Sequence, residues 1–228
     1  MDIGFVGLAG GSDDVARRLA RGGVNVFGFD SGGRAAALAD ENILTAMPTA
    51  VALARALSAP RVVWINVAPG VDTELAIQEA WPELAAGDVI VDAAAARYQD
   101  APRRAAALVT ARIHFVDCAL APIVDDPAHG HVLVFGGSPA AARVLAPFAR
   151  ILAPDPERGW LHCGPPGSGH FVRMIDEAME QGVAAPVLSV ALLRQSGRAS
   201  RDARGERLLA AIDESCGGTS VPTKDPIK

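Results

Sequence analysis

The chain contains 228 residues, of which 50% are apolar and 21% charged, and its formal net charge is −5. A chain of this length can bury a hydrophobic core, and its composition is that of a soluble globular protein with one large domain, or one domain and a smaller part. The net negative charge argues against a nucleic-acid partner, because proteins that bind polyanions carry a basic surface.

The sequence also indicates the compartment. No apolar run reaches the length of a membrane-spanning helix, and Met1 and Asp2 lead directly into an apolar strand instead of a signal peptide. Cys118, Cys163 and Cys216 are far apart and lack the spacing of metal ligands. We therefore expect a cytoplasmic protein that has free thiols, no bound metal and no membrane contact.

The N-terminal segment has the layout of a βαβ unit. An apolar strand at residues 3–6 is followed by a glycine-rich turn, an amphipathic helix that ends at Gly22 and Gly23, and a second strand at residues 24–30. This second strand ends in Asp30, at a separation that suits contact with the adenosine ribose of a dinucleotide. The arrangement predicts a Rossmann-like dinucleotide-binding unit.

The glycine-rich turn departs from the G-x-G-x-x-G fingerprint. Gly7 is retained, but Ala9 and Ser12 occupy the other two glycine positions, and Ser12 brings a side chain to a point of close helix–strand packing. Asp13 and Asp14 suit the positive end of the following helix, where they would repel the pyrophosphate that binds there. The residues alone leave open whether NAD or NADP binds at all.

The candidate cofactor-binding residues come from this unit and from the turn after the next strand. Asp30 favours NAD, whereas Arg34, which lies close by in the sequence, leaves NADP open. The complete set is Gly7, Ala9, Gly10, Asp30, Arg34, Val67 and Gly70.

Strands and helices continue to alternate through the middle of the chain. The predicted strands are residues 61–67, 88–92, 113–117 and 130–137, and the predicted helices are residues 50–57, 73–81 and 140–152. The alternation predicts an α/β fold with a doubly wound parallel sheet that helices cover on both faces.

A turn and helix at residues 164–180 carry the clearest family resemblance. The sequence GPPGSGHFVRMIDEAME begins with glycines and prolines and continues with apolar residues at helical spacing. It resembles the helix that brings a catalytic Lys and a substrate-binding Asn into the active site of 6-phosphogluconate dehydrogenases, which belong to the β-hydroxyacid dehydrogenase superfamily. The resemblance places Arg173 at the Lys position and Glu177 at the Asn position.

The resemblance extends over nearly the whole chain and implies that further family groups are replaced. Ala95 stands at the Asn of a D-G-G-N-S segment that lies near the nicotinamide and the substrate. Residues 118–123 stand in place of a substrate-binding G-T-S-G-G loop, with Ala121 at the serine and Pro122 and Ile123 at the glycines. The family frame is retained while its dehydrogenase residues are exchanged.

The C-terminal part resembles separate pieces of the family's helical substrate domain. The resemblance implies a Rossmann-like domain at residues 1–163 followed by a truncated all-helical C-terminal domain at residues 164–228. Because the helical domains of the family form its dimer interface, we expect a homodimer through this part. The apolar residues expected at the surface are Met174, Ile175, Met179, Val187 and Leu188.

The candidate catalytic residues are Arg173, Glu177, Asp176 and His170. A guanidinium stays protonated, so Arg173 cannot act as the base that a Lys provides; it either binds an anion or forms an ion pair with Asp176 or Glu177. Glu177 is either a general acid or base or a surface carboxylate. His170 matches a family residue, and the resemblance implies a role mainly in packing at the start of the helix. A further cluster either lines a site or forms a solvated turn: Asp125, Asp126, His129 and His131.

Three functions are open at this stage, and an active 6-phosphogluconate dehydrogenase is not among them. The loss of family groups at four places favours a repurposed scaffold for cofactor-independent acid–base catalysis or small-molecule binding, in a specialised biosynthetic pathway. The second hypothesis is a divergent NAD(P)-dependent oxidoreductase, for example a reductase of a small acid, carbonyl or imine. The third is an inert structural or regulatory partner.

Overall fold

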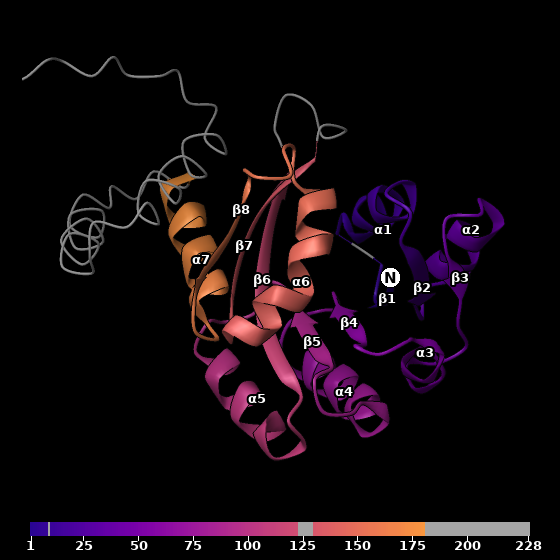
Figure 1. The fold of residues 1–228 in the computed structure, drawn as a ribbon, viewed down its shortest axis with the longest axis horizontal. Helices are drawn as coiled ribbons and strands as arrows, with labels where there is room; N and C mark the ends of the chain where they lie inside the picture. Colours follow the sequence, from indigo (N-terminus) through magenta and orange to yellow (C-terminus); the bar gives the residue numbers. More distant parts are fainter. Residues whose placement is uncertain (9, 123–129, 181–228) are drawn as a thin grey trace, which may run out of the picture.

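The computed structural model describes residues 1–8, 10–122 and 130–180, which are built around one eight-stranded sheet (Figure 1). The strands lie in the order β3-β2-β1-β4-β5-β6-β7-β8. β1 to β6 run parallel to one another, β7 is antiparallel to β6, and β8 is parallel to β7. The strand bounds are β1 (Asp2–Val6), β2 (Asn25–Phe29), β3 (Thr45–Ala46), β4 (Val62–Ile65), β5 (Val89–Asp92), β6 (His114–Pro122), β7 (His131–Gly137) and β8 (Trp160–Gly164).

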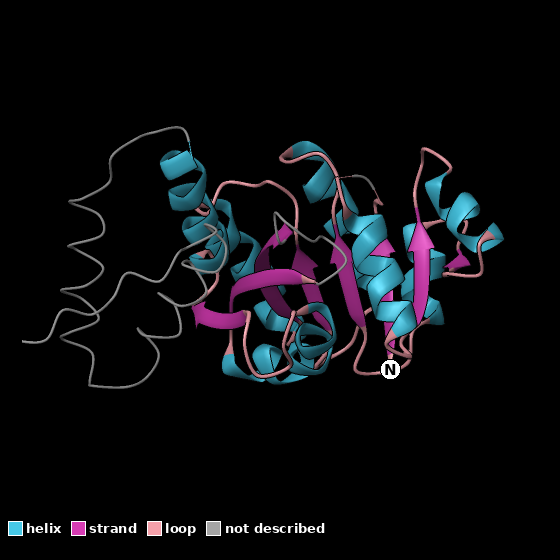
Figure 2. Ribbon diagram, turned by 90° about the horizontal axis from the view of Figure 1, so that it is seen from above, coloured by secondary structure: helices cyan, strands magenta, loops and turns pink. Residues whose placement is uncertain are grey.

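Helices cover both faces of this sheet, as the view from above in Figure 2 shows. α1, α2 and α6 pack on one face, and α3, α4 and α5 pack on the other. The arrangement confirms the predicted Rossmann-like α/β fold with a doubly wound, mainly parallel sheet. The bounds are α1 (Ser12–Arg21), α2 (Arg34–Asp40), α3 (Ala50–Ala56), α4 (Val71–Ala80), α5 (Asp100–Leu108), α6 (Pro139–Leu152) and α7 (Ser168–Glu180), with the 3-10 turns η1 (Trp81–Glu83) and η2 (Val109–Ala111).

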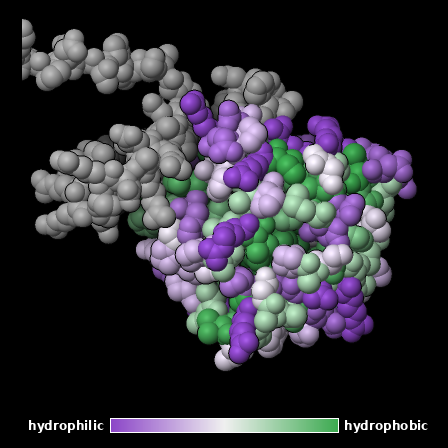
Figure 3. Space-filling model, in the orientation of Figure 1, coloured by the Kyte–Doolittle hydropathy of each residue, from purple (hydrophilic) through white to green (hydrophobic). Residues whose placement is uncertain are grey.

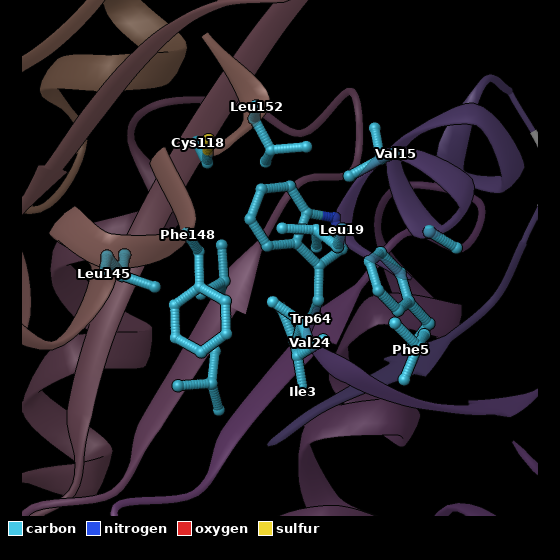
Figure 4. Packing of buried hydrophobic residues seen from close by; sticks show 14 of the residues in the cluster. Ile3, Phe5, Val15, Leu19, Val24, Trp64, Cys118, Leu145, Phe148 and Leu152 are labelled. Atoms are coloured by element: carbon cyan, nitrogen blue, oxygen red, sulfur yellow. The ribbon is translucent and has the colours of Figure 1, made fainter. Parts of the chain in front are cut away.

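The larger hydrophobic core lies between the sheet and the helices α1, α2 and α6. Phe5 and Trp64, from adjacent strands, place their ring centroids 5.9 Å apart, and Leu19 of α1 and Phe148 of α6 belong to the same core cluster (Figure 4). Removing these side chains from water is the main favourable contribution to folding. On the surface of the described part, hydrophobic areas lie among hydrophilic side chains (Figure 3).

Local sequence explains where several helices begin. The Thr49 hydroxyl accepts a hydrogen bond from the Ala52 amide (3.0 Å) at the start of α3, and the Ser138 hydroxyl accepts one from the Ala141 amide (3.1 Å) at the start of α6. α1 is different, because it begins after Gly11 and has no side-chain cap. No N-cap side chain therefore pairs with the first N–H groups of α1, although the Asp14 amide donates to the Gly11 oxygen at 3.1 Å.

The strand β6 is longer than predicted. The sequence places a loop after residue 117, but β6 continues to Pro122, and Cys118 to Pro122 pair with the first residues of the antiparallel strand β7. Pro122 is tolerated because it is the last residue of its strand, where a missing N–H costs little. The short elements α2, β3, α5 and β8 were not predicted, and Ile123 lies outside the described residues.

The helix α7 packs directly against the sheet, on the face that also carries α5. Val172 packs on a small cluster formed by Ala119, Val134 and Leu161 of β6, β7 and β8, and the Phe171 ring meets the Tyr98 ring edge-on at 5.1 Å. The expected C-terminal domain at residues 164–228 is thus described only up to Glu180, and Val187 and Leu188 lie outside the described residues. Among the helices described, none is long and apolar enough to cross a membrane.

Candidate cofactor and substrate cleft

A cavity of about 590 Å³ opens above the carboxyl ends of the central strands. It lies where the strand order changes direction between β1 and β4, the switch point at which open α/β sheets bind their ligands. The start of α1, the turns after β4 and β5, the strands β6 and β7, and α7 all contribute to its wall. The lining residues are Gly10, Gly11, Ser12, Asp14, Val15, Asn66, Val67, Ala68, Pro69, Ala93, Ala95, Cys118, Ala119, Leu120, His131 and Arg173.

The glycine-rich turn brings the backbone close to the turn after β4. Gly7 has φ +87°, and a Cβ atom at this position would lie 2.3 Å from the backbone oxygen of Asn66, so no other residue fits. Gly11 also has φ +87°, but a Cβ there would meet nothing within 4 Å. The uncapped start of α1 is therefore open on the cavity side. The third predicted contact in this turn, Ala9, lies outside the described residues.

Ser12 is accommodated instead of disturbing the helix–strand packing. Its side chain is buried, and its hydroxyl accepts a hydrogen bond from the side-chain amide of Asn66 at 2.5 Å. The close contact that a glycine would give is replaced by a polar contact between the start of α1 and the turn after β4. The Ser12 side chain is therefore compatible with the close packing of α1 beside the turn after β4.

The negative charge at the start of α1 is partly neutralised. Asp13 forms an ion pair with Arg34 at 2.6 Å. Partial burial alone would raise the pKa of Asp13, but the Arg34 guanidinium outweighs it and holds this pKa below its usual value. The predicted repulsion of a pyrophosphate is therefore reduced to Asp14, which lines the cavity.

Asp30 organises the loop after β2. Its carboxylate accepts hydrogen bonds from the backbone amides of Leu8 (3.1 Å), Gly32 (2.9 Å) and Arg34 (3.1 Å). The acid is thus fixed beside the glycine-rich turn, where the sequence places the ribose contact. Of the other two candidates, Val67 lines the cavity, and Gly70 precedes α4 with φ +96° but is not among the lining residues described.

A buried carboxylate that the sequence reading missed holds the start of α7. Asp117, at the end of the parallel part of β6, is fully buried and accepts hydrogen bonds from the amides of Gly167 (2.6 Å) and His170 (2.7 Å). Burial raises the pKa of Asp117, and these backbone hydrogen bonds oppose that rise. Gly136 and Gly169 allow the close approach, since a Cβ at either would lie within 2.7 Å of other backbone atoms. Two features of the sequence could have indicated this contact. Asp117 is an acid at the end of a buried strand, and the segment that leads into α7 is rich in glycine, which leaves its backbone amides accessible to an acceptor.

Arg173 of α7 reaches the cavity wall. Its Nη2 donates to the backbone oxygen of Ala96 at 3.1 Å, and its Nη1 donates to the Glu177 carboxylate at 2.8 Å. Its Nε is buried and has no hydrogen-bond partner. The structure shows the predicted ion pair of Arg173 with Glu177, and it also places Arg173 in the wall of the cavity.

The other predicted catalytic residues do not line the described cavity wall. Burial, followed by the charges of Arg173 and Arg104, lowers the pKa of His170 to about 4, so its buried ring is neutral at pH 7. Glu177 is about half exposed, with a side-chain exposure of 51%, and Asp176 is partly buried. The geometry supports a packing role for His170 and does not favour Glu177 as an acid–base group.

The cavity also includes His131, a member of the predicted second cluster, and Cys118, which was not a predicted site residue. His131 is 7% exposed, its Nδ1 lacks a partner, and burial followed by the charge of Arg18 lowers its pKa, so its ring is neutral at pH 7. Burial raises the pKa of the Cys118 thiol well above its usual value, which keeps it protonated. Asp125, Asp126 and His129 lie outside the described residues, and within the described ranges no cluster of side chains could hold a metal ion.

A partly buried network of ion pairs supports the turn after β5. Arg104, 2% exposed, donates to the Asp92 carboxylate at 2.5 Å and to Glu74 at 2.9 Å, and Arg103 pairs with the same Glu74 carboxylate. Burial raises the pKa of Asp92 to about 6 although Arg104 opposes the shift. The Asp92 carboxylate also accepts from the Ala94 amide at 3.1 Å, and so fixes the turn that carries Ala95 into the cavity.

The fold and the cleft define a Rossmann-like protein with the architecture of NAD(P)-binding, hydroxyacid dehydrogenase-like proteins. Residues 2–155 match the family described as the NAD binding domain of 6-phosphogluconate dehydrogenase. The chain belongs to this family, which confirms the resemblance seen in the sequence.

Among curated relatives, the chain is 29% identical over 192 residues to the decarboxylating 6-phosphogluconate dehydrogenase of Treponema pallidum, covering 79% of this chain and 39% of that protein. It is 28% identical over 180 residues to the NAD(+)-dependent decarboxylating 6-phosphogluconate dehydrogenase of Haloferax volcanii, covering 79% of this chain and 59% of the relative. The chain therefore spans less than two thirds of the length of either protein.

Solved structures show the same fold. Plasmodium falciparum 6-phosphogluconate dehydrogenase has a TM-score of 0.71 at 18% identity, covering 86% of this chain and 42% of that one. Mycobacterium tuberculosis 3-hydroxyisobutyrate dehydrogenase has a TM-score of 0.70 at 18% identity, covering 96% of this chain and 72% of that one.

Proposed function

We propose that this protein binds a nicotinamide dinucleotide at the start of α1 and a small molecule beside Arg173, and that it lacks the alcohol-oxidising activity of a 6-phosphogluconate dehydrogenase. The observation that carries the proposal is one continuous cavity that contains both the open, uncapped start of α1 and Arg173. Helix N-termini bind pyrophosphates through their free N–H groups and the helix dipole.

The residues present fit a dinucleotide. Gly7 and Gly11 leave room at the turn, Ser12 is absorbed by Asn66, and the Asp13 charge is paired with Arg34. The pyrophosphate would be held by the first amides of α1, and the adenosine ribose by Asp30. When bound, a nicotinamide supplies or accepts a hydride.

The same contacts favour NAD over NADP. The Asp30 carboxylate stands where a ribose phosphate would add negative charge, and the Arg34 side chain is already engaged by Asp13. An arginine that neutralises a neighbouring aspartate is less available for a phosphate. We therefore expect NAD(H) to bind more tightly than NADP(H).

The loss of alcohol oxidation follows from the groups around the cleft. Oxidation of a hydroxyl requires a base to take its proton, and a guanidinium does not deprotonate. Arg173 therefore cannot replace a Lys base, and neither His170 nor Glu177 belongs to the described wall of the cavity. The described cavity wall at the α7 end therefore contains no side chain suited to accept this proton. The fold of the family is retained for binding.

A second candidate is a reductase of a carbonyl or imine substrate. Arg173 can donate hydrogen bonds to such a group without changing its own protonation state. Imine reductases from Streptomyces aurantiacus and from Pseudomonas sp. are among the proteins of similar fold, each with a TM-score of 0.67. This candidate additionally requires turnover, which is measured as the decrease in NADH absorbance with carbonyl and imine acids.

Calorimetric titration of the purified chain with NAD+, NADH, NADP+ and NADPH tests the proposal. We expect micromolar binding of NAD+ or NADH, and about tenfold weaker binding after Asp30→Ala. Arg97→Ala is the matched control, because Arg97 is exposed and lies outside the cavity wall. If folded protein binds none of the four dinucleotides, the proposal is refuted, and the cofactor-independent hypothesis takes its place.

A further inference from the structure

The α7 end of the cavity differs in chemistry from the α1 end. The part of its wall that the structure describes is formed by short or apolar side chains, namely Ala93, Ala95, Cys118, Ala119 and Leu120. The Cys118 thiol is protonated, because burial raises its pKa well above the usual value. Within the described wall, Arg173 is the side chain that carries a positive charge at neutral pH, since His131 is neutral.

The hydrogen bonds of Arg173 leave one buried N–H of its guanidinium without a partner. Nη1 is held by Glu177 and Nη2 by the Ala96 oxygen, while the buried Nε–H has no partner. Buried polar groups in proteins are nearly always paired, so an orphaned N–H beside a cavity indicates an acceptor that the ligand supplies. The guanidinium is also fixed in place by its existing contacts, which reduces the entropy lost on binding.

The neighbouring Glu177 limits the charge of that acceptor. Its carboxylate, 2.8 Å from Nη1, offsets part of the Arg173 charge. A dianion such as a phosphate monoester would face this carboxylate with one cation to balance it, whereas a monoanion is compensated. A carboxylate is a planar monoanion whose geometry suits a guanidinium edge.

The apolar wall limits the body of the ligand. A sugar acid carries several hydroxyl groups, and each of them loses its water on entering the cavity and needs a protein partner. Alanine and leucine side chains offer none, and they favour a hydrocarbon body instead.

We propose that the Arg173 end of the cavity binds the carboxylate of an apolar monocarboxylic acid, with its hydrocarbon body against Ala95, Ala119 and Leu120. This inference rests on the proposed function for the identity of the cleft, and it names the class of small molecule that the cleft receives. It excludes polyhydroxylated and phosphorylated sugar acids as the preferred ligands.

The test is calorimetric titration with 4-methylpentanoate, its neutral analogue 4-methylpentanamide and 6-phosphogluconate, each with and without saturating NADH. We expect the acid to bind at least about tenfold more tightly than the amide and than 6-phosphogluconate. Arg173→Met should abolish the preference for the acid over the amide. Arg173→Lys, which keeps the charge but not the planar fork, should retain part of it.

The matched control is Arg97→Met. It removes an exposed arginine from the turn after β5, next to the Ala96 that Arg173 contacts. This variant should bind the acid like the unmodified protein. Equal binding of acid and amide, tighter binding of 6-phosphogluconate, or an unchanged acid preference in Arg173→Met would each overturn the inference. Because the titrations are also made without NADH, acid binding supports the inference even if no dinucleotide binds, and dinucleotide binding without acid binding refutes this inference alone.

Discussion

Replacing Asp117 by Asn tests whether one buried carboxylate holds α7, and with it Arg173, on the sheet. The carboxylate accepts hydrogen bonds from the Gly167 and His170 amides at 2.6 and 2.7 Å. An Asn side chain keeps one acceptor oxygen and turns an NH₂ group toward the other amide. One charge-assisted hydrogen bond is then lost and a buried N–H is left unpaired.

The magnitude follows from these two effects. A hydrogen bond to a charged group contributes about 1.5–3 kcal/mol, and an unpaired buried donor costs about 1–3 kcal/mol. Because the raised pKa of Asp117 shows that burying its charge is itself unfavourable, Asn recovers part of this loss, and we expect a net decrease of roughly 2–4 kcal/mol in the free energy of unfolding. For a chain of this size the decrease corresponds to a fall in Tm of about 4–16 °C.

Urea unfolding followed by tryptophan fluorescence, together with a thermal melt, measures the effect. Asp155→Asn is the matched control, because the Asp155 carboxylate also accepts from a backbone amide, that of Glu157 at 2.8 Å, but in an exposed turn. Its change should stay within about 0.5 kcal/mol. We also expect Asp117→Asn to weaken binding of 4-methylpentanoate more than binding of NADH. A stability within 0.5 kcal/mol of the unmodified chain, estimated from the same assay, would refute the role assigned to Asp117.

Three further predictions concern the turn, the ion-pair network and the helix surface. Gly7→Ala should lower the free energy of unfolding by at least about 2 kcal/mol more than Gly11→Ala. Both residues have φ +87°, but only at Gly7 would the added Cβ lie 2.3 Å from a backbone oxygen. Equal losses in urea unfolding would contradict the packing argument. Burial raises the pKa of Asp92 in the folded chain to about 6 from its ordinary value of 3.8, so the folded chain binds more protons than the unfolded chain between these pH values. The free energy of unfolding should therefore fall as the pH rises from about 4 to about 6. Asp92→Asn should flatten this slope, and an unchanged slope would count against the assignment to Asp92. Met174 and Met179 of α7 are 41% and 44% exposed, and we propose that they contribute to a homodimer interface. Light scattering should give a dimer for the unmodified chain and a monomer after both residues are changed to Glu. A monomeric unmodified chain would exclude the proposal.

The Rossmann-like fold was predictable because its signals are local. Apolar strands, a glycine-rich turn and an amphipathic helix follow one another in the sequence, and the acid at Asp30 marks the end of β2. The match over residues 2–155 confirms that the family resemblance was read correctly. The short helix α5 was missed because it contains Pro102 and only one large apolar side chain, that of Leu108. The strand β6 was predicted too short because its continuation depends on pairing with β7.

The contacts that shape the cleft were less predictable because they join distant residues. Asp117 meets Gly167 across 50 positions, and Asn66 meets Ser12 across 54. The sequence showed that Ser12 breaks a pattern, but only the structure shows the amide that compensates for it. Likewise, Arg173 and its neighbouring acid were identified, whereas the backbone oxygen of Ala96 that fixes the guanidinium belongs to a turn 77 positions away.

The way α7 is attached has a consequence for how this cleft can change. The backbone amides of Gly167 and His170, at the start of the helix, donate hydrogen bonds to the Asp117 carboxylate of the sheet. Gly136 and Gly169 permit close packing of the helix start on the strands. The side chain at position 173 adds only its hydrogen bond to the Ala96 oxygen, and it lines the cavity. Ligand preference can therefore be altered at position 173 without rebuilding the support, so this position is a natural starting point for engineering new binding specificities on the scaffold.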